Sequence, residues 1–365
     1  MTAAKRWKEM STEMSSKPVR RRVLMSAPGT VEVVTEPVPG LERDDALVEL
    51  SLAGVCGSDK AALHGEHAFM GPPYYPGHEV VGVVIAVGEE VDEVGVGDRV
   101  TVEPTLPCGR CKPCLSNAEN LCEDLRFFGC GYREGAMADV FSVPASRLHK
   151  IPAGLTDEQA VLIEPVATGV HAARVAGDLS GKTVAVLGSG TIGLMTMIAA
   201  REGGARRIVI TDFVAAKRQL ALELGADAVV DAAAADLAGE VRAELGESGD
   251  VVFDCVANQQ TLPEAIKVAL KGGTVMVVGG ARRPVTIDLP VVQEFQVRVQ
   301  GVATYRSEDY RDAIGMLARG VIDVDRFVTA TFPLPRADEA FAALDTGQEV
   351  KILVAADPDG RPPEA

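Results

Sequence analysis

Short runs of β-branched and other apolar residues alternate with glycine and proline along the first hundred residues. This pattern predicts strands of a partly antiparallel sheet, and the clearest runs are 31–35, 46–53 and 80–87. Residues 108–122 are rich in cysteine, with proline and glycine among them, which predicts a loop held by something other than its own secondary structure. We therefore expect a strand-rich N-terminal domain that carries one unusual loop.

From about residue 183 the pattern changes to strands that alternate with helices. Strands are expected at 184–187, 207–210, 251–254 and 274–278, and helices at 192–201, 215–224 and 263–270. This alternation predicts a parallel sheet with helices on both faces. The last part of the chain adds helices at 307–319 and 337–344 and a strand at 351–354.

Composition places the chain among globular proteins. It has 365 residues, 47% of them hydrophobic, and 36 basic against 52 acidic residues give a net charge of −16. This length predicts two domains, and the negative charge argues against nucleic acid or an anionic membrane as a partner. The sequence shows neither a run of about 20 apolar residues nor an export signal, so a cytoplasmic location is expected. Residues 1–18 are polar and are expected to form a mobile extension.

A glycine-rich turn, Gly188-Ser-Gly190-Thr-Ile-Gly193, joins a predicted strand to the next helix. Gly188 would make the tight turn, Gly190 would let the backbone approach a pyrophosphate, and Gly193 would allow close packing of the helix on the strand. The N–H groups at the start of that helix suit a phosphate. Asp212 ends the next strand, where a carboxylate can bind the adenosine ribose and would repel a 2′-phosphate, which favours NAD over NADP.

Two basic residues follow this aspartate closely. Lys217 and Arg218 are near enough in sequence to weaken the preference for NAD, and Lys217 is a candidate cofactor contact, although a solvated helix face is the simpler interpretation. A turn that serves packing alone, followed by a surface aspartate, is the alternative to a dinucleotide site.

Four cysteines, Cys108, Cys111, Cys114 and Cys122, lie within fifteen residues. Four thiolates make a closed tetrahedral shell, which is typical of a structural zinc ion that holds a loop. Four free thiols would leave the loop open to oxidation. A zinc ribbon that binds nucleic acid is a further alternative, and the acidic residues around the loop argue against it.

A second set of metal-ligand types is spread along the chain. Cys56 follows a predicted strand, His78 and Glu79 come later, and Glu164 is an acid within an apolar stretch. Cysteine, histidine and carboxylate are ligands of catalytic zinc sites, which keep one position open. A buried carboxylate is costly alone, so a metal or its water is a reasonable partner for Glu164. The two remaining cysteines are expected to be small buried residues: Cys130 and Cys255.

The order of these motifs resembles the zinc-dependent medium-chain dehydrogenase/reductase family from about residue 19 to 355. The motifs are Gly-Val-Cys-Gly-Ser-Asp at 54–59, Gly-His-Glu at 77–79, the four-cysteine loop, the glycine turn and Asp212. The segment Leu-Ile-Glu-Pro-Val-Ala-Thr-Gly-Val-His at 162–171 is similar to the sorbitol (polyol) dehydrogenase branch. Threonine and butanediol dehydrogenases are near neighbours of that branch.

The resemblance implies an α/β fold that combines a GroES-like, β-rich catalytic domain with a Rossmann domain, a doubly wound parallel sheet that binds NAD. The catalytic domain would span 19–168, with the structural zinc lobe at 107–123, and the Rossmann domain 169–305. Residues 306–365 would return to the catalytic domain. Family members are commonly dimers or tetramers, so a homo-oligomer is expected, and the sheet edge at 297–302 is a candidate for pairing across a twofold axis.

The resemblance also implies the roles of individual residues. Cys56, His78 and Glu79 would bind a catalytic zinc ion, Glu164 would bind it directly or hold its water, and Ser58 would pass the alcohol proton outward. Together with the four-cysteine site this makes two zinc ions per chain. The contacts implied on the dinucleotide, in addition to the glycines and Asp212, are Thr191, Ile192, Val278, Gly279, Val302 and Ala303.

The residue at the end of the proton relay is not identified by a motif. Enzymes of the ethanol type carry a histidine five residues after the metal cysteine, and this chain has Ala61 there. His64 and His67 are nearby in sequence, but most loop histidines are solvated. The relay is therefore expected to end in water, the cofactor ribose or another group.

The function implied is hydride transfer between a secondary alcohol, such as a polyol, cyclitol or sugar, and NAD, with zinc lowering the pKa of the alcohol. A threonine or butanediol dehydrogenase is the alternative. Related polyol enzymes tend to have Arg-Tyr where this chain has Thr304-Tyr305, so one polyol contact is expected to be missing. A non-catalytic scaffold or a zinc-free reductase would lack Cys56 or His78. The candidate pocket residues are Phe69, Tyr74, Phe128, Glu294, Arg298 and Tyr305.

Overall fold

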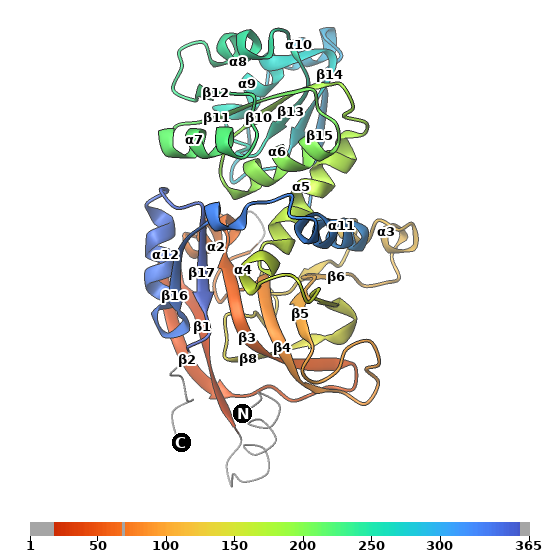
Figure 1. Cartoon of the computed structure of the whole chain (residues 1–365), viewed down its shortest axis with the longest axis vertical. Coiled ribbons are helices and arrows are strands. Elements are labelled where there is room, and N and C mark those ends of the chain that lie inside the picture. Colours follow the sequence, from red (N-terminus) through yellow and green to blue (C-terminus); the bar gives the residue numbers. More distant parts are fainter. Residues whose placement is uncertain (1–17, 68–69, 358–365) are drawn as a thin grey trace. The chain divides into compact units, whose positions relative to one another are not determined.

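A computed structural model describes residues 18–67 and 70–357 (Figure 1). Residues 1–17 of the expected extension, and Phe69, lie outside them. The chain divides into two compact units. The first unit comprises Met1–Glu164 and Val328–Ala365, and the second unit is Pro165–Phe327.

A seven-stranded sheet forms the centre of the first unit. Its order is β16-β17-β3-β4-β5-β9, with β8 beside β3, and every neighbouring pair is antiparallel except β16 and β17. The central strands bury most of both faces, because α12 and the loops cover them. The strands are β3 (Asp45–Val55), β4 (Glu79–Val87), β5 (Arg99–Val102), β8 (Val140–Pro144), β9 (Leu148–Lys150), β16 (Val328–Pro333) and β17 (Lys351–Ala355).

Smaller elements surround this sheet. An antiparallel hairpin of β1 (Val19–Ala27) and β2 (Thr30–Pro37) precedes it. A short pair, β6 (Thr105–Leu106) and β7 (Arg126–Phe127), closes the base of the cysteine-rich loop. The helices are α2 (Gly57–Leu63), α3 (Lys112–Leu115), α4 (Asp157–Ala160) and α12 (Ala337–Asp345).

The second unit is built on a six-stranded parallel sheet in the order β12-β11-β10-β13-β14-β15. All five residues of β10 are buried, as expected for a strand covered on both faces. The strands are β10 (Thr183–Leu187), β11 (Arg207–Asp212), β12 (Ala228–Asp231), β13 (Gly249–Asp254), β14 (Ala269–Val277) and β15 (Arg298–Gly301). The helices are α5 (Ile163–Ala176), which begins at the boundary, α6 (Thr191–Glu202), α7 (Ala215–Glu223), α8 (Leu237–Leu245), α9 (Thr261–Val268), α10 (Leu289–Glu294) and α11 (Ser307–Ala318).

The predicted alternation of strands and helices is confirmed, with local differences. The helix expected at 263–270 ends at Val268, and the following residues begin β14. The short strand β12 and helix α8 were not predicted, because two residues of β12 are half-buried and its apolar pattern is weak. Among the described residues, no helix has both the length and the apolar character needed to cross a bilayer.

The chain leaves and re-enters the first unit at places that differ from the expected boundaries at 168 and 305. Helix α11 belongs to the second unit, since ion pairs join it to α5. Asp309 on α11 lies 2.7 Å from His171 Nδ1 and 2.5 Å from Arg174 Nε. These buried contacts place residues 306–327 with the parallel sheet rather than with the C-terminal strands.

Candidate metal centres and dinucleotide site

Three predicted ligands of the catalytic zinc converge at the ends of β3 and β4. Cys56 follows β3 and begins α2, while His78 and Glu79 stand at the start of β4. Their ligand atoms all lie within 4.8 Å of one another. The antiparallel register, which sets Gly54 opposite Glu79, brings these distant residues together. Glu164 lies outside this group of atoms, but it is buried, and its charge acts on His78.

A buried aspartate that was not predicted as a site residue supports two of these ligands. Asp59, with no exposed surface, accepts hydrogen bonds from the Cys56 N–H (2.9 Å) and the Tyr74 hydroxyl (2.8 Å). Its carboxylate also lies 3.7 Å from His78 Nδ1, which is 3.4 Å from the Gly129 carbonyl. This side of the ring is thereby occupied, and Nε2 is left to bind a metal. Tyr74, expected in the substrate pocket, is instead a buried partner of Asp59.

Burial and charge shift the pKa values of this cluster. Burial has the largest single effect and disfavours the charged imidazolium, but the attractions of Asp59, Cys56 and Glu164 together outweigh it, so the pKa of His78 is raised well above its usual range. Burial also raises the pKa of Asp59. An acid three residues after a helix N-cap often bonds back to the cap N–H, so the Cys-Gly-Ser-Asp spacing contained a signal for this contact.

Lys351 is the second residue that sequence reasoning missed. Lys351 is 2% exposed. Its ammonium lies 2.8 and 2.6 Å from the two Glu79 carboxylate oxygens and also donates to the Val55 carbonyl. Burial disfavours this charge, but the attractions of Glu79, Cys56 and Glu164 together outweigh it, so the pKa of Lys351 is raised. The sequence signal for this residue was a lysine at the first position of an otherwise apolar strand. The ion pair fixes the Glu79 carboxylate beside Cys56 and His78.

The donor set fits a zinc ion. Sulfur, imidazole and carboxylate ligands are those of catalytic zinc, and they lie close enough to share one ion. The carboxylates of Asp59, Glu79 and Glu164 are buried in the same region, and Lys351 is the ammonium paired with one of them. A divalent cation would offset this excess of acidic groups.

Substitution of Gly54 tests how tightly the Glu79 carboxylate is held. A Cβ at position 54 would lie 1.8 Å from Glu79 Oε2, so Gly54→Ala must displace that carboxylate. We expect the variant to lose about 1–3 kcal/mol of unfolding free energy and part of its zinc, measured by denaturant unfolding and metal analysis. Gly57→Ala is the matched control, since a Cβ there meets no atom within 4 Å. Equal behaviour of the two variants would contradict this role for Gly54.

A separate prediction concerns the ion pair between Lys351 and Glu79. Lys351→Met leaves the buried Glu79 carboxylate without its cation, and removal of one partner from a buried pair costs about 3–5 kcal/mol. Lys60→Met is the control, because Lys60 forms a more exposed pair with Asp345 at 3.1 Å, of the kind that contributes about 0–1 kcal/mol. Urea unfolding should separate the two variants clearly. A loss for Lys351→Met no larger than that for Lys60→Met would contradict the assignment.

The four cysteines of the predicted structural site also meet. Their sulfur atoms lie within 4.8 Å of one another, and Cys111 Sγ is 3.4 Å from Cys114 Sγ. Backbone N–H groups of Arg110 and Cys111 lower the pKa of Cys108 to about 6. Four thiolates this close repel one another unless a cation lies between them, so the donor set fits a closed zinc site. Of the other cysteines, Cys130 is buried as expected and Cys255 is only partly buried.

In the second unit, the glycine turn has the geometry expected of a phosphate loop. Gly188 has φ +96°, and a Cβ on Gly193 would lie 1.8 Å from the Gly188 carbonyl oxygen, so α6 can approach the turn only with glycine there. A Cβ on Gly190 would meet nothing within 4 Å, which leaves open space above the helix N-terminus. Asp212 accepts N–H bonds from Ser189 (2.9 Å) and Val214 (2.8 Å), which places its carboxylate beside the turn.

The two basic residues after Asp212 are less exposed than a solvated helix face would be. Arg218 donates to the carbonyls of Asp212 (2.7 Å) and Phe213 (3.0 Å) and pairs with Asp231 at 2.9 Å. Its side chain is 17% exposed, so it fastens the loop rather than facing solvent. Lys217 is partly buried on α7. The expectation that Arg218 lies on a solvated helix face was therefore wrong.

The other residues expected to contact the dinucleotide lie where parallel strands end. Val278 and Gly279 donate to the Asp254 carbonyl, and Val302 donates to the Val277 carbonyl. Thr191 and Ile192 open α6, and Ala303 follows Val302.

Several expected pocket and relay residues have other environments. Phe128 has no exposed surface and packs on Phe141, and Tyr305 is buried against Tyr310. Glu294 and Arg298 are exposed. His64 pairs with Asp345 at 3.0 Å, His67 and Ser58 are half-buried, and Ala61 is buried.

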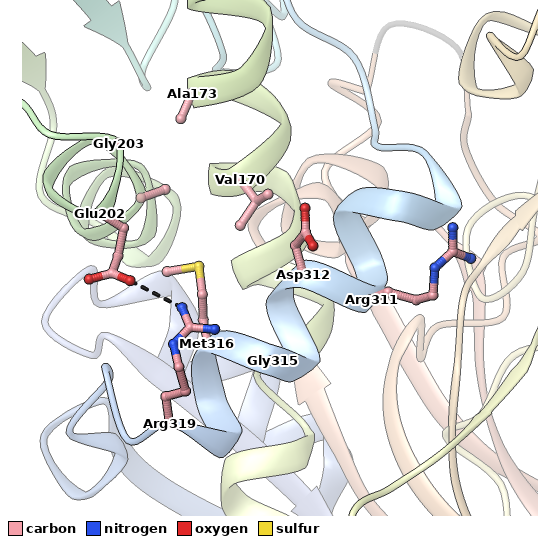
Figure 2. Close-up of a pocket in the computed structure, with 10 residues that line it drawn as sticks. Val170, Ala173, Glu202, Gly203, Arg311, Asp312, Gly315, Met316 and Arg319 are labelled. Atoms are coloured by element: carbon pink, nitrogen blue, oxygen red, sulfur yellow. Dashed lines mark hydrogen bonds and ion pairs between the residues drawn. The ribbon is translucent and has the colours of Figure 1, made fainter. Parts of the chain in front are cut away.

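A cavity of about 340 Å³ lies among α5, α6 and α11 (Figure 2). Val170 and Met316 contribute apolar atoms to it, and Glu202 and Arg319, joined at 3.1 Å, are among its polar lining. Its lining contains none of the predicted ligand or dinucleotide residues of the described chain. This cavity is therefore distinct from both candidate sites.

Comparison with known proteins identifies the families and relatives to which this chain is similar. Residues 42–153 match the alcohol dehydrogenase GroES-like domain, and residues 191–319 match the zinc-binding dehydrogenase family. Sorbitol dehydrogenase of Bacillus subtilis (strain 168) is 31% identical over 335 residues, which cover 89% of this chain and 94% of that protein.

Two solved structures are similar along nearly the whole chain. A zinc-binding dehydrogenase of Sinorhizobium meliloti 1021, bound to NADP, is 33% identical with a TM-score of 0.85, covering 93% of this chain and 100% of that one. The 2R,3R-butanediol dehydrogenase of Bacillus subtilis is 28% identical with a TM-score of 0.84 and the same coverage. The expected pairing of a GroES-like domain with a Rossmann domain is confirmed, and the chain belongs to the zinc-dependent medium-chain alcohol dehydrogenase family.

Proposed function

We propose that this protein transfers hydride between a secondary alcohol of the polyol, cyclitol or sugar type and NAD. The observation that carries the proposal is the convergence of Cys56, His78 and Glu79 in a buried acidic cluster, in a chain that also has the glycine turn and Asp212. The sorbitol dehydrogenase relative supports the substrate class. A zinc ion would supply a Lewis acid for the alcohol oxygen, and NAD would accept the hydride.

The residues around the zinc position then have separate tasks. Cys56, His78 and Glu79 would hold the ion, and Glu164 would bind it or its water. Asp59 orients the first two ligands through the Cys56 N–H and the side of the His78 ring that carries Nδ1. Lys351 holds the Glu79 carboxylate in place. A ligand set with fixed partners is pre-organised, so little ordering remains to be done when substrate binds.

Ser58 is the proposed first acceptor of the alcohol proton. It lies two residues after Cys56 in the first turn of α2 and is half-buried, so its hydroxyl can pass a proton toward solvent. His64 is held by Asp345 at the surface. We therefore propose that the relay continues through water or the cofactor ribose rather than through His64.

Asp212 is the basis for proposing NAD rather than NADP. Its carboxylate accepts two backbone N–H bonds at the turn and would repel a 2′-phosphate. The Sinorhizobium relative holds NADP, so the preference must be measured. Titration of the protein with NADH and NADPH should show tighter binding of NADH, and tighter binding of NADPH would contradict the role of Asp212.

A vicinal diol such as butanediol is the second candidate substrate, because the Bacillus butanediol dehydrogenase shares the fold over nearly the whole chain. Threonine is the related alternative. NAD reduction should be followed with polyols, cyclitols, 2,3-butanediol and threonine at equal concentrations. Turnover favouring a polyhydroxylated compound supports the first proposal, preference for butanediol or threonine supports the second, and no turnover with any alcohol contradicts both.

We also propose that the protein forms a homo-oligomer in a reducing compartment such as the cytoplasm. All four residues of β15, the edge strand of the parallel sheet, are exposed, so this strand is free to pair with a second copy. Thiolate ligands of zinc require reduced cysteines. Light scattering of the purified protein would give the number of subunits.

A further inference from the structure

A second cavity, of about 200 Å³, lies in the first unit beside the base of the cysteine-rich loop. Its lining comes from the end of β6, from β7, from the loop after β7, and from the end of β8 with the 3₁₀ turn that follows it. The lining residues are Leu106, Pro107, Arg126, Tyr132, Pro144, Ser146 and Arg147. None of the predicted metal ligands of the described chain is among them, so this cavity is separate from the candidate sites above.

The antiparallel pair of β6 and β7 separates the cavity from the proposed catalytic zinc position. Leu106 and Arg126 are opposite each other in register, and both line the cavity. Phe127 is the next residue of β7, and successive side chains of a strand point to opposite faces. Its ring lies edge-on to that of His78, with 5.7 Å between the ring centres. A ligand in the cavity would therefore lie on the face of β7 away from His78.

The lining of this cavity is positively charged, although the chain as a whole is strongly acidic. Two of the lining residues are arginines and none is an acid, while the net charge of the chain is −16. The larger cavity among α5, α6 and α11 differs, because Glu202 and Asp312 line it together with arginines. The smaller cavity is therefore the one whose charge is complementary to an anion.

Arg126 supplies the uncompensated charge of this lining. Its guanidinium lies 5.6 Å from the centre of the Tyr132 ring, and the guanidinium of Arg133 lies at the same distance from that ring. Neither arginine forms an ion pair with a carboxylate of the described chain. Arg147, in contrast, is paired with Glu103. Because an aromatic face orients a guanidinium without neutralising it, two unneutralised positive charges lie beside this ring.

We propose that this cavity binds a small oxyanion, a phosphate or carboxylate group held by Arg126 with the Ser146 hydroxyl as a further donor. The fork of N–H groups on a guanidinium matches the paired oxygens of such groups. Ser146 also lines the cavity, and its hydroxyl has no hydrogen bond to another described residue. This site is additional to the proposed function and does not depend on it.

The size of the cavity limits the ligand to a small molecule. Its volume of about 200 Å³ is below the roughly 300–1,000 Å³ of sites that enclose drug-sized ligands. Inorganic phosphate or a short dicarboxylate such as succinate fits this space, whereas a dinucleotide is too large. These two compounds are therefore the probes.

The melting temperature of the full-length, metal-bound protein is followed from about 0.1 to 20 mM phosphate or succinate, with sodium chloride adjusted to keep the ionic strength constant. An anion that binds the folded protein raises the melting temperature with concentration, and the curve gives its apparent affinity. We expect at least one of the two anions to do so. A larger rise with phosphate identifies a phosphate group as the ligand, and a larger rise with succinate identifies a carboxylate.

Three variants locate the anion. Arg126→Gln should weaken binding of the better anion by about 10- to 100-fold, and Ser146→Ala by about 3- to 10-fold. Arg133→Gln is the matched control, since it removes an equal charge at the same distance from the Tyr132 ring, from a residue that does not line the cavity. It should weaken binding by less than about 3-fold. Without anion, Arg126→Gln should melt like wild type, because Arg126 is exposed and has no ion pair to lose.

A melting temperature of wild type that does not respond to either anion would overturn the proposal. Unchanged binding by folded Arg126→Gln would also overturn it, because the anion would then bind elsewhere, for example at the glycine turn. Equal weakening by Arg126→Gln and Arg133→Gln would show a response to overall charge rather than a site in the cavity. If Arg126→Gln does not fold, Ser146→Ala decides, and unchanged binding by that variant would then contradict the proposal.

Discussion

Replacement of Cys56 by serine is expected to remove one zinc ion per chain and to reduce turnover by more than about a hundredfold, because loss of an outer partner of a ligand alone costs about 10- to 100-fold. Cys56 supplies the sulfur of the group with His78 and Glu79. The fold and dinucleotide binding should persist, since the glycine turn belongs to the other compact unit. Zinc analysis, NADH titration and steady-state kinetics would measure the three properties.

Cys130→Ala is the control for this variant. Cys130 is a buried thiol outside both groups of four and three ligands, so its loss should leave both zinc ions in place. A Cys56→Ser protein with wild-type turnover would remove Cys56 from the catalytic centre. Loss of both zinc ions in Cys56→Ser would show instead that the variant misfolds.

The second large effect is expected at the four-cysteine loop. Cys111→Ser breaks the closed donor set, and structural zinc contributes folding free energy directly. We expect a fall in melting temperature of about 5–10 °C and lower solubility, while the folded fraction keeps its turnover. The reason is that α3 and the 3₁₀ turn Glu119–Leu121 are too short to hold the loop alone.

Ser116→Ala is the control in the same loop, since the Ser116 hydroxyl is exposed and bonds only locally to the Lys112 carbonyl. It should melt close to wild type. Full stability of Cys111→Ser with both zinc ions retained would contradict the structural role. Turnover lost as completely as in Cys56→Ser would assign the loop to the chemistry instead.

The two groups of expected metal ligands could be proposed from sequence because each residue belongs to a short motif with its own chemistry. Cys108 to Cys122 form one local set, and the positions of Cys56, His78 and Glu79 follow from strand ends. The glycine turn was equally local. Its conformational requirements, positive φ at Gly188 and close packing at Gly193, follow directly from the lack of a side chain.

The partners of these ligands could not be predicted, because they depend on distant strands. Lys351 and Glu79 are separated by 272 residues, and their contact requires β17 to pair with β3, which the apolar pattern of β17 does not specify. For two aromatic residues, the environment expected from sequence differs from the one observed. Tyr74 and Phe128 were expected in a pocket and are buried in the core, since an aromatic side chain suits either place.

Zinc content per chain, measured together with alcohol turnover on wild type, Cys56→Ser and Cys111→Ser, tests the central claim most directly. The account predicts two zinc ions in wild type, one for each group of ligands, and one in each variant. Turnover should be lost in Cys56→Ser and kept by the folded fraction of Cys111→Ser. A wild-type protein that holds zinc only at the four cysteines and oxidises no alcohol would contradict the catalytic zinc assignment.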